Sequence, residues 1–388
     1  MKTKMEKFSI LSLSWMLIST YSVSTALPAM KEYYTGYSGS QVEFLVSVAA
    51  LGITCTILFN ALIAKYLKER LMVAGGLLLL SVSGVLPVFT DVYPVILVSR
   101  FLLGIGIGLV NVKAISIISE RYSGRGQETL LGFRSSFEML GNAVLTLVVG
   151  QLLVFGWQKA FSVYALGFLV LALYLMFVPV NSVKTVHTAA ENSTPGTFDQ
   201  KNMWTAVFYT ICGFLLVVAN AACSLRIPVL VEERGFGTAS TASIVLSILM
   251  SMGILAGFLY GNLLKICRER LFFFCFAGYC VGMLLMAAAG NFFLFMAGAV
   301  ITGFAHTTGV TCVFNGVAAD EPGELLSIVN STVLVGCNLG SACAPFLIGG
   351  MELVWPVSFA AFPVIGIVLL LIGWLKGRRL SVGTKDKK

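Results

Sequence analysis

Twelve long apolar segments constrain this chain more than any other feature of its sequence. Each reaches the length of about 20 residues that a helix needs to cross the hydrocarbon core of a bilayer. They are continuously apolar rather than alternating, which indicates helices, because lipid offers backbone groups no outside hydrogen-bond partner. The segments run from 8 to 30, 41 to 64, 71 to 90, 93 to 119, 127 to 155, 159 to 180, 203 to 226, 239 to 264, 271 to 290, 292 to 318, 325 to 350 and 354 to 375.

The composition favours a polytopic membrane protein over a soluble domain. Apolar residues make up 57% of the 388 residues, and charged residues only 11%. We therefore expect an all-α protein in the lipid bilayer. The first segment follows three lysines and could instead be a secretory signal, but it exceeds the usual apolar core of such a signal and precedes eleven more segments.

The distribution of basic residues predicts the orientation, because Lys and Arg accumulate in short cytoplasmic loops. With the N-terminus inside, 19 of the 26 Lys and Arg residues are cytoplasmic, and only Lys31, Lys159 and Arg234 are outside. We expect both termini in the cytoplasm and the protein in the inner, or plasma, membrane. The net charge of +8 is thus a topology signal, and no nucleic-acid partner is expected.

The cysteines and the missing motifs argue against a metalloprotein or an enzyme. All nine cysteines lie within or beside the apolar segments, and none is paired in an outer loop, so disulfides are not expected. Cys267 lies in a loop without a CxxC or His partner, and neither a metal site nor another cofactor is expected. The sequence also lacks HExxH, GxSxG and Walker A motifs, which excludes a nucleotide-driven pump.

An internal repeat appears when the sequence is compared with itself at a shift of about 200 residues. The two halves share their orientation, because matching segments begin helices on the same side. We expect a six-helix bundle at 1–180, a polar cytoplasmic linker at 181–202, and a second six-helix bundle with a cytoplasmic tail at 203–388. The matches pair Pro28 with Pro228, Glu32 with Glu232, Ser47 with Ser247, Lys65 with Lys265, Glu69 with Glu269, Arg70 with Arg270, and Gly104 with Gly303.

Within segment 93–119, Arg100 is followed by Gly104, Gly106 and Gly108. This pattern resembles the helix 4 signature of the major facilitator superfamily, and the resemblance covers nearly the whole chain. It implies a twelve-helix secondary transporter whose two bundles rock around a central cavity. It also implies a small-molecule substrate, and we expect a monomer.

The superfamily's loop between helices 2 and 3 carries acidic and basic residues that latch the cytoplasmic gate. Here the basic character survives without the usual Asp, and Glu69 or Glu269 could take its place. The gating-loop candidates are Lys65, Glu69, Arg70, Lys265, Glu269 and Arg270.

Small residues and one cap predict local structure. Gly104 and Gly108 form a GxxxG pattern, which lets two helices approach closely. Gly141 and Gly150 are also expected to pack helices, and they match the family's helix 5 antiporter signature only in part. Ser40 and Glu43 have the spacing of a capping box at the start of the second segment.

Charges inside the apolar segments are the best candidates for a substrate or coupling site, because each is costly in lipid unless paired or hydrated. Arg100 and Glu138 lie at similar estimated depths, so we expect an ion pair, either in a cavity or as a fixed structural pair. Arg134 is four residues from Glu138 and could exchange with Arg100. Lys113 and Arg134 could instead snorkel to water, and Arg226 is expected to anchor at the outer interface.

Uncharged polar groups complete the candidates. His306 could relay a proton or pack as a neutral ring. Asn220, Asn330 and Asn338 could bind a solute or bond a neighbouring helix.

These patterns predict a secondary transporter of a small organic solute that works by alternating access with protons as the coupling ion. We counted four basic groups and one acid, Glu138, within the segments, and no acid lies between Phe8 and Met30, where cation exporters of the family often carry one. An anionic or zwitterionic solute is therefore favoured. A multidrug efflux antiporter and a non-transporting membrane sensor or receptor are the alternatives.

Overall fold

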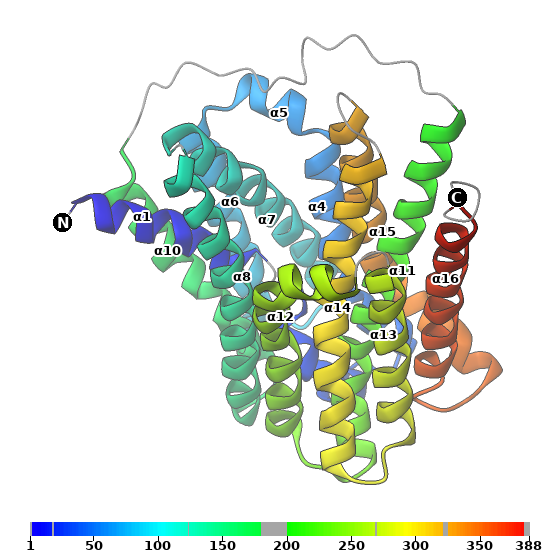
Figure 1. Ribbon diagram of the computed structural model, residues 1–388. Coiled ribbons are helices and arrows are strands. Elements are labelled where there is room, and N and C mark those ends of the chain that lie inside the picture. Colours follow the sequence, from blue (N-terminus) through cyan, green and yellow to red (C-terminus); the bar gives the residue numbers. More distant parts are fainter. Residues whose placement is uncertain are drawn as a thin grey trace. The chain divides into compact units, whose positions relative to one another are not determined.

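The computed structural model describes residues 2–17, 19–122, 124–179, 200–267, 270–320 and 325–383. Every regular element in these ranges is a helix (Figure 1). The chain divides into two compact units. The described residues of Met1–Val186 and Gly237–Ser247 form unit 1, and those of His187–Phe236 and Ile248–Lys388 form unit 2. Most of the predicted linker at 181–202 lies outside the described residues.

The first half of the chain contains ten α-helical and five 3₁₀-helical stretches within the described residues. They are α1 Lys2–Ser12, η1 Leu13–Met16, η2 Ser19–Ala26, α2 Leu27–Tyr33, α3 Gly39–Ser47, α4 Ala49–Leu58, α5 Asn60–Tyr66, α6 Glu69–Val85, η3 Leu86–Val88, α7 Tyr93–Arg121, α8 Gly124–Leu152, η4 Leu153–Phe155, α9 Trp157–Ala160, η5 Phe161–Ala165 and α10 Leu166–Phe177.

The second half consists of longer helices. They are α11 Gln200–Glu233, α12 Ala239–Cys267, α13 Leu271–Ala288, α14 Phe292–Asp320, α15 Leu325–Val354 and α16 Ala361–Gly383.

The predicted spans agree with these helices. Among the described residues, nine helices are long and apolar enough to cross a membrane, and two bent helix pairs raise the number to eleven. A shorter apolar helix, Ala361–Lys376, occupies the place of the last predicted segment. The all-α, twelve-helix membrane architecture expected from the sequence is confirmed.

Two spans are broken, which the continuous apolar pattern does not predict. Both pairs, Met5–Met16 with Ser19–Tyr33 and Gly39–Ser47 with Ala49–Leu58, bend by more than 40°. At the first break, the Ser12 hydroxyl donates to Ser9 O and the Ser19 hydroxyl donates to Met16 O, each at 2.8 Å. Such side-chain bonds to the preceding turn compete with the helical ladder and favour bending.

The capping box lies two residues earlier than predicted. Ser38 Oγ accepts the N–H of Gln41 at 3.3 Å, and Gln41 Oε1 accepts the N–H of Ser38 at 2.8 Å, so the prediction at Ser40 and Glu43 is wrong. The same four-residue spacing occurs at both places, but only Ser38 has the extended backbone of an N-cap. Glu43 is instead fully buried and pairs with Lys31 Nζ at 2.6 Å.

The two halves repeat one packing scheme. In unit 1, α6 packs on α7 and α10, while in unit 2 α13 packs on α14 and α16. A Cβ at Gly104 would overlap the carbonyl oxygen of Ala49, and a Cβ at Gly303 would overlap that of Leu249. These two contacts join residues that a shift of 199 or 200 brings together. The internal repeat is therefore visible in which backbones touch, as well as in the sequence.

Three other glycines also stand at close helix contacts. Gly108 faces Thr56, Gly141 faces the backbone of Trp15, and Gly150 faces Ser243, and a Cβ at each would come nearer than 3.0 Å to its neighbour. Small residues thus set the helix spacing in unit 1.

Candidate functional site

Arg100 lies fully buried on α7 among hydrogen-bond acceptors. Its Nε donates to Leu45 O at 3.1 Å, and its terminal nitrogens donate to Thr20 O at 2.6 Å and to Tyr164 Oη at 2.7 Å. Tyr164 donates in turn to Ser19 O at 2.7 Å. These carbonyls belong to the two bent spans, so the Arg100 guanidinium joins the backbones of η2 and α3 near the bends.

The expected ion pair between Arg100 and Glu138 is therefore wrong. Glu138 pairs with Arg134 on its own helix, while the Arg100 guanidinium bonds to carbonyls. Similar depth does not fix the direction in which a side chain leaves its helix. The geometry of Arg100 is that of a structural residue that holds two bent spans.

Arg134, Glu138 and Asn111 form a polar group inside the spans of α7 and α8. Glu138 Oε2 lies 3.4 Å from Arg134 Nη1, and Arg134 Nη2 donates to Asn111 Oδ1 at 2.9 Å. The Arg134 and Glu138 side chains are 11% and 17% exposed. Arg134 Nε is buried with no acceptor among the described residues.

This group has the chemistry to bind an acidic solute and carry a proton. A guanidinium presents several N–H donors in a planar fork that suits carboxylates and phosphates. Glu138 supplies a carboxyl beside it that can gain or lose a proton as the guanidinium changes partners. Lys113 is half-buried two residues beyond Asn111 on α7.

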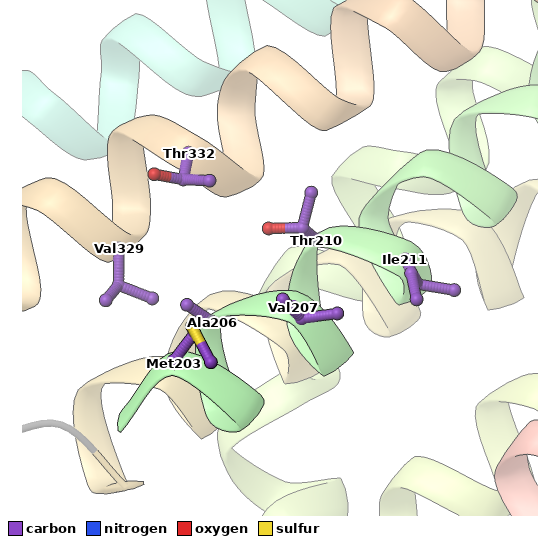
Figure 2. A pocket seen from close by; sticks show the side chains of 7 residues that line it. All are labelled: Met203, Ala206, Val207, Thr210, Ile211, Val329 and Thr332. Carbon is purple, nitrogen blue, oxygen red and sulfur yellow. The ribbon is translucent and has the colours of Figure 1, made fainter. Parts of the chain in front are cut away.

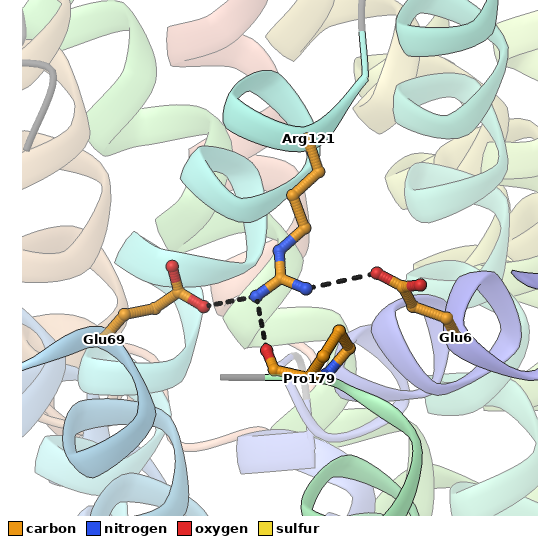
Figure 3. A network of polar contacts seen from close by, with 4 residues as sticks. All are labelled: Glu6, Glu69, Arg121 and Pro179. Carbon is orange, nitrogen blue, oxygen red and sulfur yellow. Dashed lines mark hydrogen bonds and ion pairs between the residues drawn. The ribbon is translucent and has the colours of Figure 1, made fainter. Parts of the chain in front are cut away.

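A second ionic cluster joins helix ends at the predicted cytoplasmic side of unit 1 (Figure 3). Arg121, at the end of α7, lies 3.1 Å from Glu6 Oε1 and 3.1 Å from Glu69 Oε1, and it donates to Pro179 O at 3.3 Å. Its side chain is only 6% exposed. Since these partners come from α1, the start of α6 and the segment after α10, one guanidinium ties four helices together.

Tyr122 follows this cluster outside the spans. Burial and the nearby Glu6 carboxylate raise the pKa of Tyr122, although Arg121 opposes the change. The Lys7 ammonium lies 5.3 Å from the centre of its ring. The tyrosine is therefore a neutral ring that a cation covers.

The other gating-loop candidates have contacts of their own or are exposed. Arg70 donates to Leu175 O at 3.0 Å and so links α6 to α10. Lys65 is exposed, with its ammonium 5.9 Å from the centre of the Tyr66 ring. Lys265 and Arg270 are exposed at the end of α12 and just before α13, and Glu269 lies outside the described residues.

In unit 2, His306 on α14 contacts Tyr279 on α13. The Tyr279 hydroxyl lies 3.1 Å from His306 Nδ1, and the rings meet edge to face. On the same helix, Cys312 Sγ lies 3.9 Å from Cys275 Sγ and accepts a hydrogen bond from Tyr260 at 3.7 Å.

Lys376 forms the counterpart of the Arg121 cluster in unit 2. It hydrogen-bonds Tyr209 on α11 and lies 3.8 Å from Asp320 Oδ2 at the end of α14, while Tyr209 donates to Asp320 at 2.6 Å. Its ammonium also covers the rings of Phe208 and Phe272 at 5.3 and 5.1 Å. Like the Arg121 cluster, this one joins several helices, here α11, α14 and α16.

Arg226 does not anchor at the membrane interface, contrary to expectation. It is 2% exposed, and its Nε lies 2.7 Å from Glu352 Oε1, which links α11 to α15. Among the asparagines, Asn338 donates to Leu334 O of its own helix at 3.0 Å, and Asn220 is half-buried on α11. Asn330 Oδ1 is buried with no hydrogen-bond partner among the described residues.

Sequence reasoning missed several paired groups. Glu43 lies within the second predicted segment, so the count of one intramembrane acid is wrong. Arg121 and Lys376 entered only as topology charges. The available signal was that both residues lie at the end of an apolar segment. In addition, Arg121 and Asp320 are related by a shift of 199 and carry opposite charges.

The comparison with protein families decides the class of the chain. A sequence model of the Major Facilitator Superfamily matches residues 10–266 and 234–388. The chain belongs to this superfamily. It is a multi-pass membrane transporter and not an enzyme.

Known members show how far the likeness to superfamily proteins extends. The multidrug resistance protein MdtL of Vibrio parahaemolyticus serotype O3:K6 (strain RIMD 2210633) is 23% identical over 323 residues, which cover 79% of this chain and 80% of that protein. A D-xylose-proton symporter aligns with a TM-score of 0.74 at 15% identity, covering 96% of this chain and 98% of the symporter. A bacterial homologue of the human lysosomal transporter Spinster, solved inward-facing and unoccupied, aligns with a TM-score of 0.72 at 15% identity, covering 96% of this chain and 97% of that structure.

Glu69 is an acidic residue in the loop where the superfamily usually carries an Asp. The loop between helices 2 and 3 lacks the usual Asp, and Glu69 supplies a carboxylate that binds Arg121. The second half offers Asp320 and Lys376 at the corresponding helix ends.

Proposed function

We propose that this superfamily transporter moves a small anionic or zwitterionic organic solute across the inner membrane, coupled to protons, by alternating access. The observation that carries this proposal is the group of Arg134, Glu138 and Asn111 within the spans of unit 1. In this group, the Arg134 guanidinium has one N–H, at Nε, without an acceptor among the described residues, and the Glu138 carboxyl group lies beside it. Ionisable side chains are costly within membrane spans, and those that occur there are mostly functional.

The charges of the other groups support the choice of substrate. Glu43 neutralises Lys31, and Glu352 neutralises Arg226. Arg100 is occupied by carbonyls. The cationic side chains of these segments that remain are Arg134, which pairs with Glu138, and Lys113 on α7. Two cations against one acid leave an excess of positive charge, which favours an acidic group on the solute.

Glu138 is the proposed proton carrier. When the solute's acidic group binds Arg134, Glu138 loses part of its countercharge and takes up a proton; release of the solute reverses both events. His306, hydrogen-bonded to Tyr279 in unit 2, is the second candidate for proton transfer.

Purified protein in liposomes tests the coupling. Glu138→Gln keeps the hydrogen-bonding shape of the side chain but cannot titrate, so pH-driven accumulation should be lost while exchange of labelled for unlabelled solute persists. His306→Gln is the matched variant for the second candidate. Full pH-driven uptake by Glu138→Gln, together with its loss in His306→Gln, would assign the role of proton carrier to His306 in unit 2.

A multidrug efflux antiporter is the second candidate, because the curated relative is a multidrug resistance protein. Competition assays in proteoliposomes distinguish these two candidate functions. Organic anions should inhibit uptake and tetraphenylphosphonium should not, if the cationic group selects the solute. Efficient transport of that lipophilic cation would contradict the proposed substrate class and favour drug export.

A further inference from the structure

A pocket of about 310 Å³ lies between α11 and α15, near the start of both helices (Figure 2). This volume is at the small end of the range for ligand sites in proteins. Met203, Val207 and Ile211 follow one another at helical spacing along α11 and line one wall. None of the described residues that line the pocket is charged.

One polar atom in this apolar pocket has no partner. Thr210 Oγ1 is buried without a hydrogen-bond partner among the described residues. In Figure 2, this oxygen is turned toward the space between Ala206, Val329 and Thr332. A buried hydroxyl without a partner costs free energy, and such groups usually bind a water or a ligand.

Packing explains why Thr210 presents its hydroxyl to the pocket. A Cβ at Gly336 would overlap Thr210 Cγ2, so the methyl group of Thr210 already rests against the bare backbone of α15. A β-branched side chain has few rotamers, and this contact directs the hydroxyl away from the backbone of α15 at Gly336. Thr332, on the facing helix, has satisfied its own hydroxyl by donating to Ile328 O at 2.9 Å.

We propose that this pocket binds a small neutral amphiphile, with its apolar body against Met203, Val207 and Ile211 and a hydroxyl or amide on Thr210 Oγ1. Neutrality follows from the uncharged lining, since an ion here would lack a countercharge. The residues of this pocket belong to unit 2 and include neither Arg134 nor Glu138, and the proposal does not depend on the transported solute.

The experiment measures thermal stability of the purified full-length protein against four probes that share a six-carbon ring. Cyclohexanol should raise the melting temperature in a saturable manner, because a ligand of the native state stabilises it. Methylcyclohexane, cyclohexanecarboxylate and cyclohexylammonium should give a clearly smaller shift at equal concentration.

Two matched variants locate the effect. Thr210→Val keeps the methyl contact with Gly336 and removes only the hydroxyl, so the apparent Kd for cyclohexanol should rise about fivefold, as for one neutral hydrogen bond. Thr332→Val removes a hydroxyl that is already bonded and should leave the Kd unchanged. An equal response to methylcyclohexane, an unchanged Kd in Thr210→Val, or no saturable shift at all would overturn the proposal.

Discussion

At the scale of single residues, Arg100 and Arg134 show two different ways to keep an arginine in a membrane span. Arg100 donates to carbonyls of two bent helices, and Arg134 has a carboxylate and an amide as partners. The first arrangement is fixed by the backbone, whereas the second consists of side chains that can exchange partners. The contacts of Arg100 are those of a structural residue, and Arg134 is the residue that we propose for solute binding.

Replacing Arg100 should be costly even when the charge is kept. Lysine offers a single ammonium in place of the planar fork, so Arg100→Lys should lose at least two charge-assisted hydrogen bonds, or about 3 kcal/mol of stability or more. Tyr164→Phe removes the neutral bond to Ser19 O and only one of the charge-assisted bonds of Arg100, so it should cost less, about 2 kcal/mol. Melting temperatures in detergent check the order, and equal losses in the two variants would contradict it.

The absence of a pair between Arg100 and Glu138 can itself be measured. Because the two side chains bond to different partners, the free-energy changes of Arg100→Gln and Glu138→Gln should add in the double variant to within about 0.5 kcal/mol. A double variant markedly more stable than the sum of the single losses would restore the ion pair that depth alone suggests.

At the scale of elements, the bent spans distinguish unit 1 from unit 2. The position related to Arg100 by a shift of 199 is Ala299, and the corresponding spans in the second half of the chain are the continuous helices α11 and α12. The arginine and the bends therefore occur together in one half of the repeat and are both missing, among the described residues, from the other. This is the pattern expected if open carbonyls at a break require a buried donor.

The repeated glycine contact gives a prediction for both halves. Gly104→Ala and Gly303→Ala should each lower the melting temperature strongly, because the added Cβ would meet a carbonyl oxygen of the backbone. Gly75→Ala in α6 is the control, since a Cβ there meets nothing within 4 Å. It should be neutral or slightly stabilising, as alanine is the better helix former by about 1 kcal/mol. Similar losses at all three positions would contradict close packing as the cause.

At the scale of the whole molecule, the orientation in the membrane remains a prediction from the basic residues. We expect Ser381 and Asn192, the latter outside the described residues, to face the cytoplasm and Gly36 to face outward. Single cysteines at these positions, in a background without the nine native cysteines, can be labelled in intact cells with an impermeant maleimide. Labelling at 36 alone is expected, and labelling at 192 alone would reverse the topology.

The sequence predicted the large features because lipid enforces them. A span needs a long apolar run, and repeats show in self-comparison, so the twelve segments and the correspondence of Gly104 with Gly303 could be read directly. The bends and the hydrogen-bond partners of Arg100 could not. They depend on where side chains such as Arg100 point and on acceptors more than 50 positions away, which periodicity does not encode.

The hydrogen bonds of Arg100 also limit which second mutations can compensate for its loss. Its N–H groups donate to carbonyls in two separate spans. A second mutation that straightens one span therefore leaves the carbonyl of the other span without its donor. A selection for second-site suppressors of Arg100→Leu should therefore yield revertants and double changes far more often than single compensating substitutions.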